Sequence, residues 1–225
     1  MEFANAHLTR HIDIIHPDQL KVPIHIIGAG AIGSFTAMLL AKMGAEDITV
    51  WDYDTVSVEN MSCQFYRFKD IGTPKVLALR ELVQEFTNVV IKPIQKEWTA
   101  QTVQETRGIV ISAADSMAVR RDLFAFCQKD FRVKFFIDSR MGAETALLYC
   151  MNPQNTQDRT SYANTFYTDE NSVQEKCTAK ATTYTASLLS GMVVKTVKDL
   201  LTQQEYPRIT QWSIKDNDFQ CWVKQ

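Results

Sequence analysis

The sequence predicts an α/β protein: a Rossmann-like, mostly parallel sheet with helices on both faces and antiparallel strands toward the C-terminal part. From Ile24 onward, short apolar runs of strand length alternate with segments that have helical apolar spacing. The first apolar run leads directly into a glycine turn, Gly28-Ala29-Gly30-Ala31-Ile32-Gly33. An alternation of this kind favours parallel strands that are joined by helices and buried on both sides.

Each element follows from its local pattern. The run Ile24–Ile27 predicts a strand, and the Ala-, Leu- and Met-rich segment from Ala31 to Met43 predicts the helix after it. Apolar residues recur at helical spacing between Pro74 and Phe86, which predicts a second helix. By the same reasoning we predict strands over 47–51, 89–94, 108–113, 135–138 and 144–150, and a helix over 117–128.

The domain organisation is predicted from breaks in this pattern. Residues 1–20 are polar and mixed, so we expect an N-terminal arm or a short helix there. Residues 21–205 are expected to form one domain, with a long polar loop at 152–176 and a helix from about Thr178 to Leu201. The remaining 206–225 are expected to form a tail of short strands or an arm.

Composition restricts the class of protein. The chain has 225 residues, 45% hydrophobic and 22% charged, with a net charge of −2, so neither nucleic acid nor an anionic membrane is expected as a partner. No apolar run approaches the ~18 residues of a membrane span, and no signal peptide is expected. The 5 cysteines include no C-x-x-C pair, which argues against a disulfide framework and favours a reducing, cytoplasmic location.

The glycine turn and the acidic residue after the next strand indicate a nucleotide site. Gly28 allows a tight turn, Gly30 lets a phosphate approach the backbone, and Gly33 lets the helix pack close to the sheet. The N-terminus of the following helix offers free N–H groups to phosphates. Asp52 is placed to accept hydrogen bonds from a ribose hydroxyl.

An ordered set of motifs follows this turn. Asp52-x-Asp54-x-Val56 leads to Asn60, then Ile71-Gly72-Thr73-Pro74-Lys75 opens a helix, and Ala113-Ala114-Asp115 precedes Arg120. In this set the chain resembles the ThiF/MoeB/HesA family, the adenylating enzymes related to ubiquitin-activating enzyme. The resemblance extends from about Leu8 to Leu201.

The resemblance implies an adenylyltransferase that binds ATP with magnesium. The C-terminal carboxylate of a ubiquitin-like or sulfur-carrier protein would attack the α-phosphate, and pyrophosphate would leave. It implies that Gly28, Gly30 and Gly33 admit the phosphates and that Asp52 holds the ribose. Further residues with implied roles are Asn60 and Lys75 at the phosphates and Asp115 as the magnesium ligand.

Several of these residues also have ordinary structural interpretations. Asp54 is expected to brace its loop, and Lys75 to be either a phosphate ligand or an exposed first-turn lysine. Asp115 fits both magnesium binding and the N-cap of the helix after it, two compatible roles. Arg120, one turn into that helix, either serves the site or pairs with a carboxylate.

Cys63 is the main departure from the family pattern. Family members usually have N-L-x-R-Q, whose arginine touches the triphosphate, whereas this chain has Asn60-Met61-Ser62-Cys63-Gln64. A cysteine cannot supply the guanidinium fork. Arg67 and Arg140 are the two candidates to replace it, and the alternative is a protein that binds nucleotide but adenylates poorly.

Two more residues are candidates through the resemblance. Arg10 aligns with the arm arginine that reaches the ATP of the other subunit in family homodimers, although the aromatic residue and the glutamine of that motif are absent. Cys177 is a candidate thioester cysteine, favoured by Lys176, Lys180 and an expected helix N-terminus. The family's zinc needs two C-x-x-C pairs, so zinc is not expected.

Two other functions remain as alternatives. The chain is a non-catalytic ThiF-like partner subunit or scaffold if the arginine missing at Cys63 is not replaced. The glycine turn and Asp52 also fit an NAD-dependent oxidoreductase, which would leave Asn60, Lys75 and Asp115 without a role. The sequence does not identify the carrier or the pathway.

Overall fold

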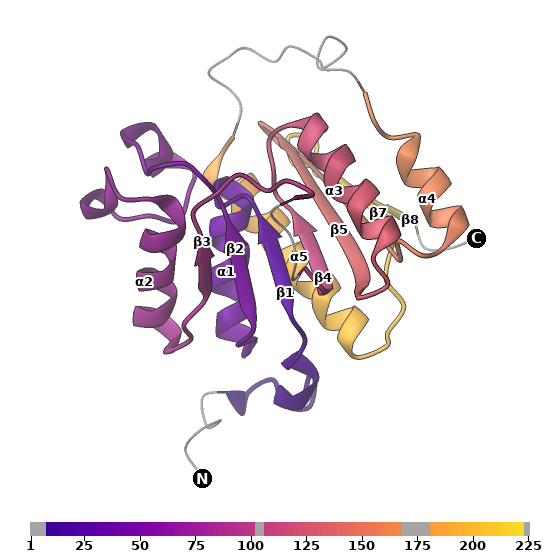
Figure 1. The fold of residues 1–225 in the computed structure, drawn as a ribbon, viewed down its shortest axis with the longest axis horizontal. Coiled ribbons are helices and arrows are strands. Elements are labelled where there is room, and N and C mark those ends of the chain that lie inside the picture. Colours follow the sequence, from indigo (N-terminus) through magenta and orange to yellow (C-terminus); the bar gives the residue numbers. More distant parts are fainter. Residues whose placement is uncertain (1–7, 102–105, 168–180, 223–225) are drawn as a thin grey trace.

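One mixed sheet organises the protein, which is described here by a computed structural model covering residues 8–101, 106–167 and 181–222. Within these residues the strand order is β3-β2-β1-β4-β5-β6-β7-β8. The parallel part consists of β3 (Lys92–Ile94), β2 (Ile48–Trp51), β1 (Ile24–Ile27), β4 (Gly108–Ser112) and β5 (Val133–Gly142). The antiparallel part adds β6 (Thr145–Met151), β7 (Ile209–Ser213) and β8 (Asp218–Trp222). The predicted fold class is therefore confirmed (Figure 1).

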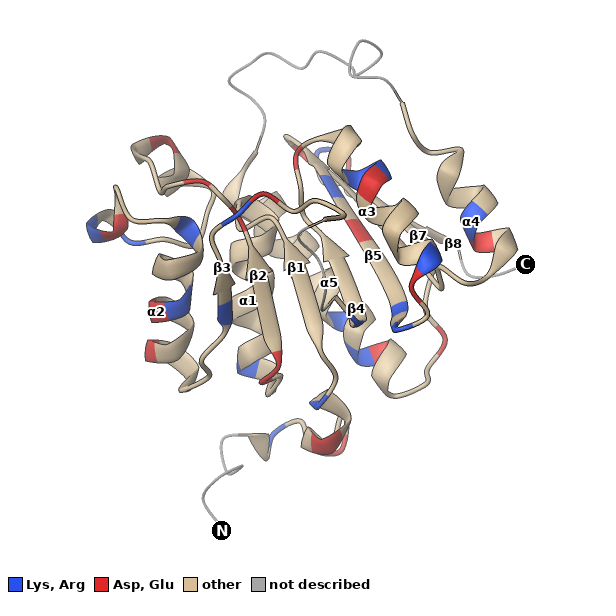
Figure 2. Ribbon diagram, viewed as in Figure 1, with Lys and Arg blue, Asp and Glu red and all other residues tan. Residues whose placement is uncertain are grey.

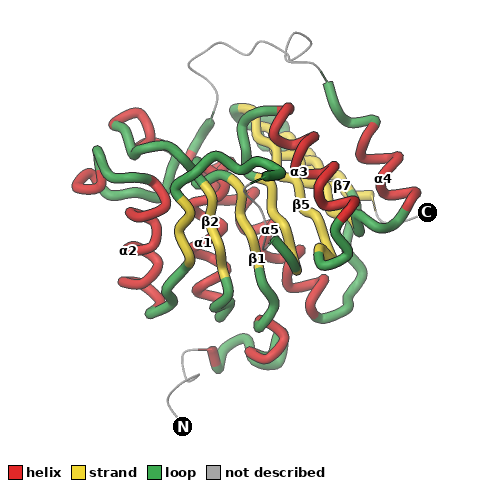
Figure 3. Tube along the Cα trace, viewed as in Figure 1, coloured by secondary structure: helices red, strands yellow, loops and turns green. Residues whose placement is uncertain are grey.

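Helices cover both faces of this sheet (Figure 3). The helices α1 (Ala31–Met43), α2 (Lys75–Thr87) and α5 (Thr183–Leu201) contribute to one apolar cluster. The helices α3 (Met117–Lys129) and α4 (Thr156–Ala163) contribute to a second cluster on the other face. Ile26 of β1 belongs to the first cluster and Ile27 to the second, because successive side chains of a strand point to opposite faces.

Four predicted boundaries are wrong, and one of them is the strand predicted over 135–138, which is the longer β5. The predicted loop at 152–176 contains α4, which begins after Asn155, whose side chain accepts hydrogen bonds from the backbone N–H groups of Gln157 and Asp158. The predicted strand 89–94 is limited to β3. The helix expected from about Thr178 begins at Thr183, because Thr182 provides its N-cap.

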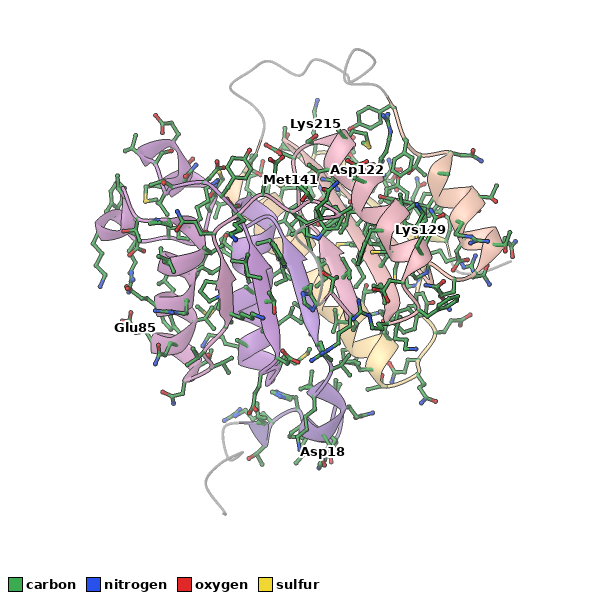
Figure 4. The ribbon with its side chains drawn as sticks, viewed as in Figure 1. Asp18, Glu85, Asp122, Lys129, Met141 and Lys215 are labelled. Atoms are coloured by element: carbon green, nitrogen blue, oxygen red, sulfur yellow. The ribbon has the colours of Figure 1, made fainter. Side chains whose placement is uncertain are left out.

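The predicted N-terminal arm is docked in its described part. Leu8, Ile15 and Leu20 are buried, and a 3-10 helix covers Pro17–Leu20. The His11 Nε2 atom lies 3.0 Å from the Met43 carbonyl oxygen at the C-terminus of α1. Figure 4 shows labelled Asp18 of this segment at the end of the molecule opposite Met141, which lies near the carboxyl end of β5. This segment therefore lies at the amino ends of the parallel strands.

The C-terminal tail extends the sheet, as its predicted short strands require. β7 pairs with β6, and β8 pairs with β7, both antiparallel. No helix of the described residues has the length and apolar character needed to cross a bilayer.

Candidate functional site

The glycine turn connects β1 to α1 at the carboxyl end of the parallel strands. Gly28 has φ +101°, and a Cβ at this position would lie 2.5 Å from the Ala113 carbonyl oxygen. A Cβ at Gly33 would overlap the Gly28 carbonyl oxygen. Both glycines are therefore required because backbone segments of β1, α1 and the residues after β4 meet closely here.

Gly30 has a different reason to be glycine. Its φ of −76° is open to any residue, and a Cβ there would meet no atom within 4 Å. Gly30 is the N-cap of α1, whose first-turn N–H groups lack partners within the helix. The open space beside these donors fits an anionic group such as a phosphate.

Asp52 joins the end of β2 to the glycine turn. One of its carboxylate oxygens accepts a hydrogen bond from the Ala29 backbone N–H at 2.7 Å, and the other accepts from the Asp54 N–H at 2.8 Å. These bonds hold the turn against β2 and leave each oxygen a further lone pair for a ligand hydroxyl.

Lys75 is buried at the start of α2 and paired with Asp54. Its Nζ lies 2.8 Å from Asp54 Oδ2, and its backbone N–H donates to the Asp54 carbonyl oxygen at 2.9 Å. The expected bracing role of Asp54 is thus present as a contact with Lys75. Because only 6% of the residue is exposed, the interpretation of Lys75 as an exposed first-turn lysine is wrong.

The segment after β2 folds over the beginning of α1. Asn60 Oδ1 accepts a hydrogen bond from the Ser57 N–H at 2.9 Å, which orients its amide. Tyr66 donates its hydroxyl to the Ala29 carbonyl oxygen at 2.6 Å, and the Phe65 N–H donates to Ser34 Oγ at 3.0 Å. No sequence motif singles out Tyr66, because a tyrosine that reaches back to the turn has no distinctive local pattern.

Asp115 is exposed just beyond the carboxyl end of β4. It does not cap α3, because Ser116 is the N-cap and its hydroxyl accepts from the Val119 N–H. The interpretation of Asp115 as an N-cap is wrong, and its carboxylate is left to other partners.

The acidic side chains of this edge lie near Tyr53. The pKa of the exposed Tyr53 hydroxyl is raised, first by the charge of Asp54, then by Asp115 and burial, with smaller effects of Glu97 and Asp52. Carboxylates from the ends of β2 and β4 therefore act on the same place. No group of three or more His, Cys, Asp or Glu residues in the described part is arranged to hold a metal. A magnesium ion here would need oxygens of a bound phosphate, which is its usual arrangement at nucleotide sites.

Arg67, one candidate for the missing arginine, is held in an ion-pair cluster. Its Nη2 lies 2.9 Å from Asp70 Oδ1, and its Nη1 lies 2.5 Å from Glu85 Oε2 in the last turn of α2. Burial acts to raise the pKa of Asp70, but the hydrogen bonds from Arg67 and its charge together lower it below the ordinary value. The guanidinium of Arg67 is therefore engaged by Asp70 and by carboxylates of α2, among them Glu85, which Figure 4 labels.

Arg140, the other candidate, is buried in β5. Its Nε lies 2.6 Å from Asp138 Oδ2, while Nη1 and Nη2 donate to the carbonyl and hydroxyl oxygens of Thr165, each at 2.9 Å. All three of its nitrogens are thus engaged. Arg120 also pairs with Asp138, so its structural interpretation has a partner. The role of Arg67 or Arg140 at a triphosphate stays a prediction.

The remaining candidates are distributed differently. Arg10 is exposed on the described N-terminal segment, which Figure 1 shows at the amino ends of the parallel strands, whereas the glycine turn follows the carboxyl end of β1. Cys63 is half-buried directly after a 3-10 helix at Val58–Ser62. Cys177 lies outside the described residues, so its role and the helix N-terminus expected beside it stay predictions. Cys150 is buried in β6, as expected for a strand residue, and burial raises the pKa of its thiol.

Comparison with known proteins places this geometry in one family. The model of the ThiF family matches residues 12–223. A tRNA threonylcarbamoyladenosine dehydratase 2 from Saccharomyces cerevisiae is 27% identical over 139 residues, covering 56% of this chain and 31% of that protein. The molybdopterin-synthase adenylyltransferase of Escherichia coli is 28% identical over 107 residues, covering 45% of this chain and 43% of that protein. The chain thus matches less than half the length of these two relatives.

Solved structures share the fold at low sequence identity. Escherichia coli MccB with ATP has a TM-score of 0.74 and 14% identity, covering 99% of this chain and 72% of that chain. MccB in complex with N-formylated MccA has a TM-score of 0.78 and 14% identity, covering 98% of this chain and 72% of that chain. These values show a common fold.

Proposed function

Because this chain belongs to the ThiF family, we propose that it uses ATP to adenylate the C-terminal carboxylate of a ubiquitin-like or sulfur-carrier protein. The observation that carries the proposal is the placement of four features at one edge of the sheet: the open space at Gly30, the carboxylate of Asp52, the ammonium of Lys75 and the carboxylate of Asp115. Relatives named as adenylyltransferases support the reaction class. The carrier is an inference from such names, including a ubiquitin-like modifier-activating enzyme.

The chain's residues suit this reaction by position and charge. In the proposed step a carboxylate oxygen bonds to the α-phosphorus, the bond to the bridging oxygen breaks, and pyrophosphate leaves with the electron pair. Lys75 would stabilise charge on the phosphate oxygens, and Asn60 would donate its amide N–H groups to them. Asp115 would hold magnesium, which neutralises phosphate charge when bound.

Exchange between ATP and radioactive pyrophosphate tests this function. The full chain should catalyse exchange only when magnesium and a carrier with a C-terminal carboxylate are both present. A carrier whose C-terminus is amidated should give no exchange, and NAD should not replace ATP in binding. Tight binding of ATP without exchange, with any member of a panel of such carriers, would instead favour the non-catalytic partner subunit.

The non-catalytic alternative has a specific observation in its favour. Cys63 stands where the family pattern has an arginine, and both candidate replacements, Arg67 and Arg140, already have carboxylate partners. The NAD-dependent oxidoreductase has no comparable observation in its favour. The match is to the ThiF family, and a hydride-transfer function would give no role to the ion pair of Lys75 with Asp54.

Alanine variants at Arg67 and Arg140 identify the replacement for the missing arginine. The variant that removes a triphosphate ligand should lower exchange by about 100-fold, since an arginine fork stabilises charge that develops in the transition state. Arg67→Ala leaves the exposed Glu81 and Glu85 hydrated but removes the cation beside the buried Asp70, so its folding must be checked first. In Arg140→Ala, Asp138 keeps its ion pair with Arg120. Full exchange in both folded variants would rule out both residues, and Arg121→Ala, an exposed arginine of α3, serves as the control.

Two further parts of the proposal concern Arg10 and Cys177. In a homodimer Arg10 would reach the ATP of the partner subunit, because it lies at the opposite end of the parallel strands from the glycine turn of its own chain. Mixing Arg10→Ala with Lys75→Ala subunits should then restore activity at one site, and no restoration at any ratio would reject this role.

Cys177 would form a thioester with the activated carrier. A thiol-labile conjugate that persists in Cys177→Ser would reject this role of Cys177. The cytoplasmic location expected from the cysteine content also remains a proposal.

A further inference from the structure

A buried carboxylate with two arginines lies beside the candidate site. Asp138 is 0% exposed, and Arg120 and Arg140 are 6% and 8% exposed. Arg120 pairs with Asp138 Oδ1, whereas Arg140 Nε and the Tyr162 hydroxyl donate to Oδ2 at 2.6 and 2.9 Å. We call these four residues the Asp138 cluster. Figure 2 shows positive and negative segments following one another along β5, where two members lie.

The Asp138 cluster is an unusual way to hold a fold together. Taking three charges out of water is costly, and apolar residues of similar volume are often as stabilising as a buried ion pair. Apolar packing is already extensive at this place, because the Tyr162 ring centroid lies 4.5 Å from that of Phe124 and 5.5 Å from that of Phe136. The contacts that the arginines make beyond Asp138 therefore matter most.

Both arginines reach backbone carbonyl groups on either side of β5. Arg120 Nη2 donates to the carbonyl oxygen of Ala114, the residue directly before Asp115, and Nη1 also donates to the Ser139 carbonyl oxygen at 3.0 Å. Arg140 donates to Thr165, just beyond α4. The carboxylate of Asp138 thus holds one guanidinium on the Asp115 loop, residues 113–116, and the other on the turn after α4.

The Asp115 loop depends on contacts from its neighbours. The Ala113 N–H donates to the Ile27 carbonyl oxygen at 2.8 Å, and the Ser139 hydroxyl donates to the Ser112 carbonyl oxygen at 2.8 Å. Asp115 itself is exposed and does not cap α3. Ser116 ties the end of this loop to α3, and the guanidinium of Arg120 holds the residue directly before Asp115, with Asp138 fixing the orientation of that guanidinium.

We propose that Arg120 and Asp138 are positioning residues, which hold the Asp115 loop where the Asp115 carboxylate meets a magnesium ion on the phosphates of ATP. Arg140 and Tyr162 contribute by fixing the second oxygen of Asp138. This proposal rests on the proposed function. Its physical basis is that a metal ligand binds tightly only when its supporting contacts hold it in place.

The decisive variant is Arg120→Lys, studied by ATP binding to the full chain. A lysine keeps the charge opposite Asp138, but its single ammonium cannot donate at once to Asp138, Ser139 and Ala114. The dissociation constant for ATP is measured with excess Mg²⁺ and with EDTA. We expect the gain in ATP affinity that Mg²⁺ gives to fall by about tenfold, because loss of a residue that supports a metal ligand typically weakens metal binding by that much. The dissociation constant for ATP in EDTA should stay within about twofold of the wild-type value.

Amide hydrogen exchange provides a readout without ligand. In Arg120→Lys, exchange should rise in residues 113–116 and stay unchanged in residues 28–33, whereas general destabilisation would raise both. Tyr162→Phe keeps the aromatic packing and removes one hydrogen bond to Asp138, so the magnesium-dependent gain should fall by about threefold. It replaces Arg120→Lys if that variant does not fold. Arg132→Lys, which changes an exposed arginine paired with Asp130, is the matched control and should behave as wild type.

The outcomes separate this proposal from the proposed function. The positioning role is overturned if a folded Arg120→Lys protein keeps both the wild-type gain in ATP affinity from Mg²⁺ and the wild-type amide hydrogen exchange at residues 113–116. Equal losses of affinity with Mg²⁺ and with EDTA overturn it as well. If the wild-type protein binds ATP without any effect of Mg²⁺, the proposed function fails, and hydrogen exchange at 113–116 alone then decides whether Arg120 holds the loop.

Discussion

Replacing Lys75 by alanine should lower ATP–pyrophosphate exchange by about 100-fold or more, because a buried ammonium beside the phosphates acts where solvent screening is weak. Asp54 Oδ2 lies 2.8 Å from the Lys75 Nζ and orients this ammonium. The hydrogen bond from the Lys75 backbone N–H to the Asp54 carbonyl oxygen does not need the lysine side chain, so the alanine variant keeps it. The fold should survive, since the side chain of Asp54 is 48% exposed and remains hydrated without its partner.

The matched control is Lys69→Ala, which removes an exposed lysine from the short 3-10 helix at Phe68–Asp70. It should keep wild-type exchange and a wild-type melting temperature. If ATP–pyrophosphate exchange in Lys75→Ala stays within about threefold of wild type, Lys75 does not act on the phosphates, because removal of a group that stabilises transition-state charge lowers the rate by much more than this. Circular dichroism must show that the variant is folded before the rates are compared.

Gly33→Ala should destabilise the protein strongly, whereas Gly30→Ala should mainly weaken ATP binding. A Cβ at Gly33 meets the backbone oxygen of Gly28, which cannot move without displacing α1 from β1. We expect a loss of about 3 kcal/mol or more in the free energy of unfolding, the upper range for overpacked sites. A Cβ at Gly30 meets no protein atom, so its effect on stability should stay near the ~1 kcal/mol of an N-cap change.

ATP titrations and urea unfolding measure the two effects separately. Gly30→Ala should raise the dissociation constant for ATP by at least about tenfold, because the methyl group occupies space where a phosphate would approach. Gly191→Ala, in an open position on α5, is the control and should bind ATP normally and gain slightly in stability. If Gly30→Ala binds ATP as wild type does, the phosphates do not lie against this turn.

Local periodicity was sufficient to predict the parallel half of the fold. The strand at Ile24–Ile27, the helix at Ala31–Met43 and the helix from Met117 were expected within one or two residues of their bounds. The reason is that strands buried on both faces carry apolar runs, whereas helices that pack one side on a sheet repeat apolar residues at helical spacing. Segments that depend on a cap were less predictable: α4 has a polar sequence, and its start depends on the side chain of Asn155.

The candidate site was predicted in part. The glycine turn, Asp52 and Asp115 follow the ends of parallel strands, which meet at one edge of the sheet, and Lys75 opens the helix α2. The partners of charged residues could not be predicted in this way. Arg140 was a candidate for the triphosphate, yet its contacts are with Asp138 and Thr165, and Thr165 lies beyond a helix that was not expected.

The sequence by itself determined the order of the elements, the glycine turn and the chemical types of the candidate residues, because these depend on local spacing and backbone sterics. Only the tertiary structure decided which carboxylate each cation meets. Asp54 meets Lys75, Asp70 meets Arg67, and Asp138 meets both Arg120 and Arg140. Lys75 and Asp54 lie 21 residues apart in the chain, and Arg120 and Asp138 lie 18 apart, so only the packing of the chain sets the distance between these charges. Arg67 and Arg140 pair with carboxylates only 3 and 2 residues away, and for these local pairs the packing decides how far the charges are buried.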